Sequence, residues 1–238
     1  MIGLEIRNLS YSYGAKRALD DVNFHVEAGS FCALLGPNGA GKSTLINLLT
    51  RLFTTTQGEI KLAGIDLKIA PREALARIGI VFQQSTLDLD LSVRQNLSYF
   101  AALHGYSGKK AHERIDESLD RLGMLERAHE KARALNGGHR RRAEIARALI
   151  HKPSVLLLDE ATVGLDAAAR ASITNHVHGL TKDGTTVLWA THLTDEVRDT
   201  DRLLILHQAR VLADGIAGYI SGETTLQDRF LRLTGASK

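Results

Sequence analysis

Gly36-Pro37-Asn38-Gly39-Ala40-Gly41-Lys42-Ser43-Thr44 is the most informative stretch of this 238-residue chain. It follows the apolar run 31–35, which has the length of a buried strand, and it leads into 43–52, which has the apolar periodicity of a helix. Residues 36–43 match the pattern G-x-x-x-x-G-K-[ST], whose glycines let consecutive backbone N–H groups turn toward one centre. The N-terminus of the following helix adds partial positive charge. We therefore predict a phosphate-binding loop between a strand and a helix.

The polar side chains around this loop predict a nucleotide site. Lys42 is expected to reach the β- and γ-phosphates as a point charge, and Ser43 to offer its hydroxyl to Mg²⁺. A second motif is the apolar run 155–158, which ends in Asp159 and Glu160. Ligands of parallel sheets lie at the carboxyl ends of strands, so Asp159 is placed to hold Mg²⁺ and Glu160 to polarise an attacking water. These two motifs predict a P-loop nucleotide hydrolase or kinase.

The composition is that of an ordinary globular protein, with 44% hydrophobic residues, 24% charged residues and a net charge of +3. A single cysteine excludes a disulfide framework and a cysteine-built metal site. No apolar run approaches the roughly 18 residues that a membrane-spanning helix needs. The first ten residues lack the basic and apolar regions of a signal peptide. We therefore expect a cytoplasmic chain that reaches a membrane only through a partner.

The order of strand-like and helical patterns predicts an α/β fold with a mostly parallel sheet that is covered on both faces. The earliest strands have no helices between them, so we expect them to form a separate antiparallel layer. The predicted helices are 42–52, 93–104, 110–122, 140–151, 167–181 and 226–233. We expect a single domain over 1–238, with a nucleotide-binding core of 1–84 and 152–238 and an inserted helical subdomain of 85–151.

Further motifs make the sequence specific. The run Leu135-Asn136-Gly137-Gly138-His139 resembles the L-S-G-G-Q signature of ABC-type ATPases, and a helical pattern follows it. Other residues resemble the adenine-stacking aromatic, the Q-loop glutamine, the D-loop and the switch histidine: Tyr13, Gln83, Gly164-Leu165-Asp166 and His192. These motifs stand in the family's order over essentially the whole chain. The chain resembles the ATP-binding subunit of an ABC transporter, closest to the ATPases of drug exporters, which implies a RecA-like P-loop NTPase core.

The resemblance implies ATP and Mg²⁺ as cofactors and ATP hydrolysis as the activity. It implies that the nucleotide contacts Tyr13, Gly36, Pro37, Asn38, Gly39, Ala40, Gly41, Lys42, Ser43, Thr44, Gln83, Asn136, Gly137, Gly138 and Asp159. It implies that the metal is held by Ser43, Gln83 and Asp159, and that hydrolysis depends on Glu160, His192, Gln83 and Lys42.

The glycine pair Gly137-Gly138 precedes a predicted helix, whose N-terminal N–H groups would form a second anion site. In ABC-type ATPases the two sites of one chain face different ATP molecules. The resemblance therefore implies head-to-tail pairing with a second ATPase subunit, either identical or different. It also implies integral membrane permease partners, docking through the helical insertion, and a location on the inner face of the cell membrane.

The partner predictions rest on two further stretches and one basic cluster. Residues 85–97 and 226–235 resemble the ATPases of two-component exporters, which favours export over import. The arginines at 140–142 have no aromatic residues between them for base stacking, so we interpret them as a solvated face and expect no nucleic-acid partner.

The signature departs from the family pattern, because Asn136 replaces Ser and His139 replaces Gln. The Asn side chain can still bond a phosphate oxygen, but it is bulkier, and His139 adds a titratable group near phosphate. We therefore expect an active but slower site. The alternatives are a soluble ABC-type ATPase of cofactor assembly or nucleic-acid maintenance, and a small-molecule kinase, which leaves the glycine pair unexplained. The sequence does not specify the transported substrate.

Overall fold

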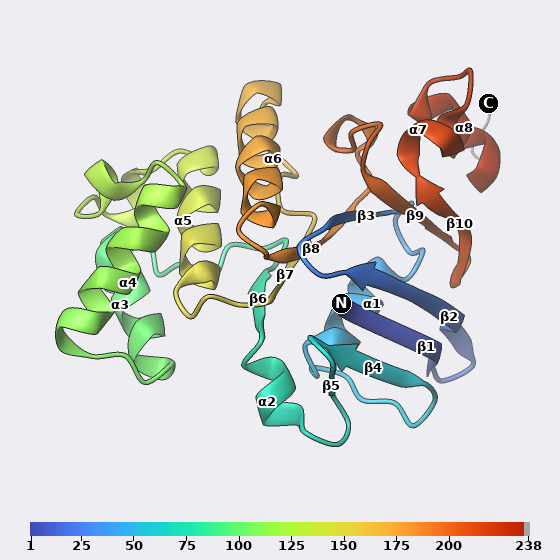
Figure 1. Ribbon diagram of the computed structural model, residues 1–238. Coiled ribbons are helices and arrows are strands. Elements are labelled where there is room, and N and C mark those ends of the chain that lie inside the picture. The colour runs from blue at the N-terminus through green and yellow to red at the C-terminus, as the bar shows by residue number, and fades with distance from the viewer. Residues whose placement is uncertain (236–238) are drawn as a thin grey trace.

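The computed structural model describes residues 1–235 as two β-sheets with helices around them (Figure 1). The strands are β1 (Ile2–Tyr13), β2 (Lys16–Glu27), β3 (Phe31–Leu35), β4 (Glu59–Leu62), β5 (Ile65–Asp66), β6 (Ile78–Val81), β7 (Val155–Asp159), β8 (Thr186–Thr191), β9 (Arg202–His207) and β10 (Arg210–Ile216). The helices are α1 (Lys42–Leu49), α2 (Pro71–Leu75), α3 (Val93–Leu103), α4 (Gly108–Arg121), α5 (Gly137–Leu149), α6 (Ala167–Thr181), α7 (Ala217–Ser221) and α8 (Leu226–Thr234). Single 3-10 turns are η1 (Leu125–Arg127), η2 (Ala132–Ala134) and η3 (Thr194–Glu196).

The central sheet has six strands in the order β10-β9-β3-β8-β7-β6. All neighbouring pairs are parallel except β9 and β10, which confirms the predicted mostly parallel sheet. The strand β3 is buried on both faces: Phe31, Ala33 and Leu35 belong to one hydrophobic core, and Cys32 and Leu34 to the other. This alternation follows from the two-residue period of a strand. The strand order places β3 between β9 and β8, in the interior of the sheet.

The first two strands join β4 and β5 in an antiparallel sheet of order β2-β1-β4-β5. Its inner side chains, among them Leu4, Val22 and Leu62, share a core with α1 and with one face of the central sheet. The predicted antiparallel layer is therefore confirmed. Because this layer covers one face of the central sheet, it brings the end of β1 close to the start of α1, where Tyr13 contacts Thr44.

The helices α3, α4 and α5 lie at one end of the molecule, away from the antiparallel sheet (Figure 1). Within 85–151 the only strand-like pairing is an isolated bridge between Ser92 and Lys131. Buried side chains of this region, such as Leu97, Ile115 and Ile145, belong to the same core as the second face of the central sheet. The helical part therefore packs on the sheet through a continuous hydrophobic core.

The element boundaries differ from the predictions where local conformation overrides the hydrophobic pattern. The helix predicted at 140–151 begins at Gly137, because the Asn136 side chain caps it and accepts a hydrogen bond from the His139 N–H at 2.8 Å. The helix predicted at 42–52 ends at Leu49, and Arg51 beyond it has a left-handed φ of 61°. The elements β5, α2 and α7 were missed, since runs of two to five residues carry too little periodicity.

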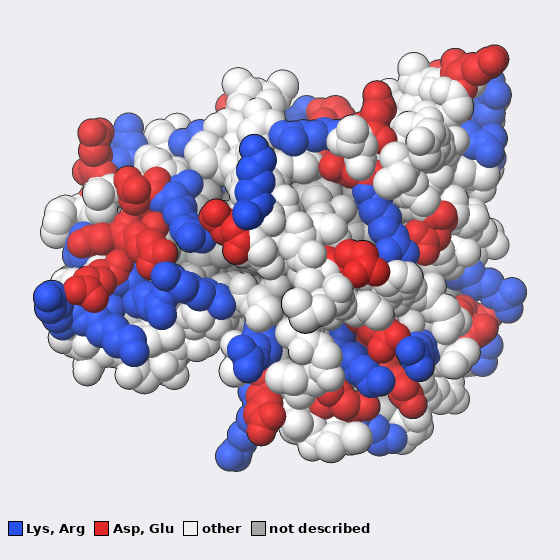
Figure 2. All heavy atoms as spheres, in the orientation of Figure 1, with Lys and Arg blue, Asp and Glu red and all other residues white. Residues whose placement is uncertain are grey.

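The surface carries both signs of charge. Figure 2 shows basic and acidic side chains interspersed over the visible face. Several of them form ion pairs, for example Lys152 with Glu117 at 2.8 Å and Arg202 with Asp214 at 2.8 Å. Within residues 1–235, none of the helices has the length and apolarity that would let it cross a lipid bilayer.

Candidate active site

The phosphate loop connects β3 to α1 in a backbone conformation that depends on glycine. Gly39 and Gly41 have φ values of 80° and 114°, a region that side chains disfavour. A Cβ on Gly36 would lie 2.5 Å from the Leu206 carbonyl oxygen, and a Cβ on Gly41 would lie 2.4 Å from the Ala18 carbonyl oxygen. Because Gly41 caps α1 without a side chain, the first N–H groups of this helix are left for an anion.

Lys42 is buried at the start of α1 and points back into the loop. Its Nζ donates to the carbonyl oxygens of Gly36 at 2.6 Å and Pro37 at 3.2 Å, and it lies 3.3 Å from Oε1 of Glu160. Burial lowers the pKa of Lys42, and the negative charge of Glu160 opposes this shift. The amine therefore lies against acceptors of the loop, and Glu160 balances its charge inside the protein.

Ser43 and Asp159 come together across the sheet end. The Ser43 hydroxyl donates to Oδ1 of Asp159 at 3.5 Å, and Asp159 is the last residue of β7. Burial raises the pKa of Asp159, while the hydrogen bond from Ser43 works against the rise. Within residues 1–235 there is no cluster of three or more His, Cys, Asp or Glu side chains that could hold a metal by itself. One hydroxyl with one carboxylate fits Mg²⁺, which usually keeps waters and substrate phosphates as its other ligands.

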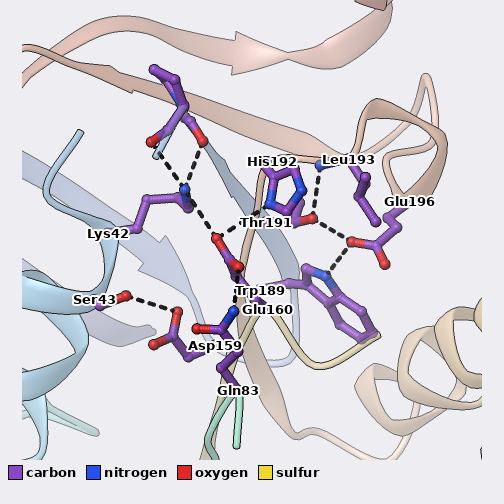
Figure 3. Close-up of polar contacts among 12 residues, drawn as sticks. Lys42, Ser43, Gln83, Asp159, Glu160, Trp189, Thr191, His192, Leu193 and Glu196 are labelled. Carbon is purple, nitrogen blue, oxygen red and sulfur yellow. Dashed lines mark hydrogen bonds and ion pairs between the residues drawn. The ribbon is translucent and has the colours of Figure 1, made fainter. Parts of the chain in front are cut away.

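Glu160 is the residue on which the polar side chains converge (Figure 3). Its Oε1 lies 3.3 Å from Nδ1 of His192 as well as 3.3 Å from Lys42, and its Oε2 accepts a hydrogen bond from Nε2 of Gln83 at 3.1 Å. Gln83 follows β6, Glu160 follows β7 and His192 follows β8, so the three lie at the carboxyl ends of adjacent parallel strands. The backbone of Glu160 has a left-handed φ of 47°, and its N–H donates to Ala190. A non-glycine residue held in this conformation is often functional.

Tyr13 lies at the open side of the loop. Its hydroxyl is 3.3 Å from the Thr44 hydroxyl, its side chain is 45% exposed, and its ring packs edge-on against Tyr11 and Phe53. The ring of Tyr11 stacks on Phe53 instead, which leaves Tyr13 as the aromatic face at the cleft. The cleft is lined by Tyr13, Lys16, Arg17, Ala18, Asn38, Gly39, Gly41, Lys42, Ser43, Thr44, Gln83 and Glu160.

The signature residues lie apart from this cleft. In the part of the chain that the structure describes, none of Asn136, Gly137 and Gly138 lines it. They form the N-terminus of α5, where Asn136 and Gly137 are exposed to solvent. Their neighbours are the D-loop and the start of α6: a Cβ on Gly137 would lie 2.9 Å from Leu165, and one on Gly138 would lie 3.2 Å from the Cβ of Ala169.

Sequence reasoning missed a buried carboxylate behind His192. Glu196 in η3 is 2% exposed, and its Oε2 accepts hydrogen bonds from Trp189 Nε1 at 2.9 Å and from the Thr191 hydroxyl at 2.5 Å (Figure 3). The Thr191 carbonyl accepts from the N–H of Gly36 at 3.2 Å, so this network also reaches the phosphate loop. Lys16 and Arg17, which line the cleft, were missed as well. Their only signal is two basic residues shortly after the predicted adenine-stacking tyrosine.

The interpretation of the basic cluster as a solvated face is wrong for Arg141. Its side chain is 7% exposed and contacts Phe82, Gln83 and Glu144. Arg147, two turns along α5, is 6% exposed. The sequence contained a signal, because Arg141 and Glu144 are opposite charges three residues apart on a helix, but the hydrophobic pattern did not place them inside.

The glycine loop that opens α1, with Lys42 at its head and two carboxylates at the end of a parallel strand, defines a P-loop nucleotide hydrolase. The sequence model of the family described as ABC transporter matches residues 19–163. The chain belongs to the ABC transporter family, as an ATP-binding ATPase cassette. The prediction made from the motifs is thereby confirmed, as is the predicted fold.

Comparison with individual proteins also identifies ABC transporter cassettes as relatives of this chain. The chain is 40% identical to the daunorubicin resistance ATP-binding protein DrrA3 of Streptomyces coeruleorubidus, over 89% of this chain and 67% of that protein. It is 34% identical to the linearmycin resistance ATP-binding protein LnrL of Bacillus subtilis, over 94% of this chain and 74% of that protein. The dimeric structure of the bacterial ABC transporter cassette MJ0796 superposes with a TM-score of 0.79 at 29% identity, over 90% of this chain and 98% of that one.

Proposed function

We propose that this chain is the ATP-hydrolysing subunit that energises an ABC membrane exporter. The observation that carries the proposal is the position of Glu160, which Gln83, Lys42 and His192 surround next to the phosphate loop. The relatives support export in particular, because their names are those of drug-resistance and Nod factor export ATP-binding proteins. The family model matches residues 19–163, which include the phosphate loop, Gln83, Asp159 and Glu160.

In this proposal the triphosphate lies over the N-terminus of α1. The loop N–H groups and Lys42 would bind the β- and γ-phosphates, and the ring of Tyr13 would stack on the adenine. Ser43 and Asp159 would hold Mg²⁺, with Gln83 near them, and the ion would neutralise charge on the phosphates. Binding then draws Lys42 from the loop carbonyls onto the phosphate oxygens.

Hydrolysis would depend on Glu160. A carboxylate in this position accepts a proton from a water that attacks the γ-phosphate in line. Gln83 would orient the carboxylate and the water, since its amide already donates to Oε2 of Glu160. His192 would donate a hydrogen bond to the γ-phosphate from the other side of the carboxylate. Gln83, Glu160 and His192 all follow strand ends of one sheet, which keeps their spacing rigid.

The second glycine site supports a head-to-tail dimer. Asn136 to Gly138 are outside the chain's own cleft, and α5 begins at an exposed surface. A phosphate bound there would belong to the ATP of a second cassette, so that each ATP touches Lys42 of one subunit and the glycine pair of the other. The dimeric cassette structures among the structural relatives support this arrangement.

The membrane partners would be integral permease subunits, and the cassette would lie on the inner face of the cell membrane. We assign the nucleotide-binding core to 1–84 and 152–238 and the helical subdomain to 85–151. The docking surface would be on the helical subdomain, where Leu89, Tyr99 and Leu103 expose large apolar side chains. Exposed apolar side chains of this kind are typical of interaction surfaces.

The test is the Glu160→Gln variant, which keeps the size of the side chain and removes the base. We expect ATP hydrolysis to fall by about 10²- to 10⁴-fold and the ATP-bound variant to run as a dimer in size-exclusion chromatography. Asp183→Asn, at an exposed site after α6, is the matched control and should leave both properties unchanged. A Glu160→Gln variant that hydrolyses ATP at the wild-type rate would exclude the proposed function.

A further inference from the structure

The segment that follows β6 is fixed to one face of α5. Arg141 donates from Nη1 to the carbonyl oxygen of Phe82 at 2.7 Å and from Nη2 to the carbonyl oxygen of Gln83 at 2.7 Å. These two bonds hold the backbone carbonyl groups that precede and follow the Cα of Gln83. The planar, forked guanidinium makes this possible, because its donors point at two neighbouring acceptors at once.

Two more charged residues on the same face of α5 complete the attachment. Glu144 accepts from Arg141 at 2.7 Å through Oε2 and from the N–H of Thr86 at 2.7 Å through Oε1. Arg147 donates to the Thr86 carbonyl oxygen at 2.9 Å, and its guanidinium lies 4.1 Å from the ring centroid of Phe100. Residues three apart on a helix share a face, so the three side chains form one row along the segment. We call Arg141, Glu144 and Arg147 the α5 clamp.

The α5 clamp is buried. Its side chains are 7%, 2% and 6% exposed, and each charge has a partner. Burial lowers the pKa of Arg141, with Glu144 opposing the shift. Burying three charged residues adds little to the free energy of unfolding, because the cost of removing the charges from water offsets most of their attraction. What such a network does supply is one defined geometry for the backbone that it holds.

The clamp lies between the two nucleotide-binding elements of the chain. At one side, Gln83 donates to the Glu160 carboxylate at 3.1 Å. At the other, the same helix begins at Asn136 and Gly137, the residues that would face a second cassette's ATP in the proposed dimer. A helix moves as a rigid body over these two turns, so a shift of its N-terminus is passed to the backbone at Gln83.

We propose that Arg141, Glu144 and Arg147 are positioning residues that couple the glycine pair at the start of α5 to the Gln83–Glu160 contact. This inference rests on the proposed ATPase function. Closure of the dimer on the phosphate at α5 then sets the place of Gln83 in the chain's own site. The clamp does not touch the nucleotide, and it acts on the rate of hydrolysis rather than on ATP binding.

The experiment compares two arginine variants of the full-length chain. Arg141→Gln removes the fork and its charge, whereas Arg142→Gln removes an equal charge from the same helix, at a residue that donates to Ser172 on α6. For Arg141→Gln we expect kcat to fall by about 10- to 100-fold, with the KM for ATP within about twofold of wild type. For Arg142→Gln we expect both constants to stay within about twofold of wild type.

A second readout is independent of catalysis. The Thr86 N–H is protected by Glu144, so Arg141→Gln and Glu144→Gln should both speed hydrogen exchange at this amide and leave that of β7 unchanged. If Arg141→Gln does not fold, the isosteric Glu144→Gln provides the same comparison of kcat with KM. Equal kcat values for Arg141→Gln and Arg142→Gln, or a loss that appears only in KM, would overturn the coupling role.

The wild-type chain and Glu160→Gln are measured in the same series. If the wild type shows no ATPase activity, the proposed function fails, whatever the arginine variants do. If the wild type is active, Glu160→Gln is inactive and Arg141→Gln matches wild type, the proposed function stands and the clamp alone is wrong.

Discussion

The helices α1 and α5 both begin next to glycines, and their N-termini differ in nearly every other respect. At α1 the cap is Gly41, no side chain satisfies the first N–H groups, and the buried Lys42 faces the same centre. At α5 the cap is Asn136, whose side chain occupies the His139 N–H, and the start of the helix is exposed. The N-terminus of α1 lies in a cleft lined by its own chain, whereas the N-terminus of α5 would be half of a site in the proposed dimer.

The comparison indicates that the surroundings of a helix N-terminus make it specific for one role. The partial charge of a helix end is general, so the surroundings decide what it binds. Around the phosphate loop there are a buried cation, Lys42, and two carboxylates at the end of β7, Asp159 and Glu160. Around the signature there is an exposed surface next to the D-loop, which a second cassette would cover in the proposed dimer. The following predictions separate the two sites.

The largest effect is expected at the first site. Lys42→Ala removes the cation that we expect on the phosphates, and a hydrogen bond to a charged group is worth about 1.5–3 kcal/mol. We expect the Kd for ATP to rise by about 100-fold, measured with a fluorescent ATP analogue. Lys182→Ala, at an exposed position after α6, serves as the control. Wild-type affinity in Lys42→Ala would contradict the assignment of this loop as the main phosphate site.

The next largest effect is expected at Glu196, which accepts hydrogen bonds from residues next to His192. Glu196→Ala leaves Trp189 Nε1 and the Thr191 hydroxyl without their buried acceptor, which is expected to cost about 1–3 kcal/mol of unfolding free energy. Glu196→Gln keeps an acceptor oxygen and should cost less. Urea denaturation measures the free energy of unfolding of both variants. Equal losses in the two variants would show that the acceptor oxygen at position 196 does not contribute to stability.

The same carboxyl predicts a pH dependence. Burial raises the pKa of Glu196 above its ordinary value of 4.5, so the folded protein binds this proton more tightly than the unfolded chain does. Its contribution to stability is complete below the ordinary value and is lost as the pH rises through the raised one. This loss is absent in Glu196→Gln, whose side chain does not titrate. The free energy of unfolding of the variant should therefore increase relative to that of wild type as the pH rises, measured by denaturation at about pH 4, 5, 6 and 7.

The second site is tested by Gly138→Ala. The added methyl would lie 3.2 Å from Ala169 and over the N–H groups at the start of α5. We expect hydrolysis to fall by about tenfold, with ATP binding by the single chain unchanged. Gly179→Ala in α6 is the matched control, because a Cβ there has open space and a helical glycine gains stability from the change. Loss of ATP binding in Gly138→Ala would mean that both sites act on one nucleotide.

The smallest effect is expected from Asn136→Ser. Serine caps a helix about as well as asparagine does, so α5 should keep its stability. Its smaller side chain should let the dimer close more tightly, and we expect the ATPase rate to rise by about threefold, which is under 1 kcal/mol. Steady-state rates across about pH 6–8 provide the measurement. Equal rates at every pH would remove the argument that Asn136 and His139 slow the site.

Much of the fold was predictable because its signals are local. The strand and helix around 36–43 follow from apolar periodicity, and the buried run 155–158 marks a parallel strand. The bounds of α6 at Ala167–Thr181 agree with the prediction, since Asp166 caps the helix and accepts from the Ala169 N–H. The start of α5 was placed too late because its first residues are two glycines and a histidine, which have no apolar pattern.

The contacts of the site were less predictable, because they join residues far apart in the chain. Gln83 and Glu160 are 77 positions apart, and Arg141 and Phe82 are 59 apart. No periodicity extends over such separations. The buried role of Arg141 in particular contradicts the expectation for an arginine-rich run, since burial depends on what packs against the helix.

The phosphate loop, the two carboxylates and the class of enzyme could be predicted from the sequence alone, because each of these depends on neighbouring residues whose spacing is set by the backbone. The folded structure was needed to show which groups surround Glu160, that Glu196 accepts hydrogen bonds from residues next to His192, and that the α5 clamp holds the backbone at Gln83. The physical reason is that a buried polar group must find partners wherever the fold supplies them, and those partners come from strands and helices that chain order does not place together.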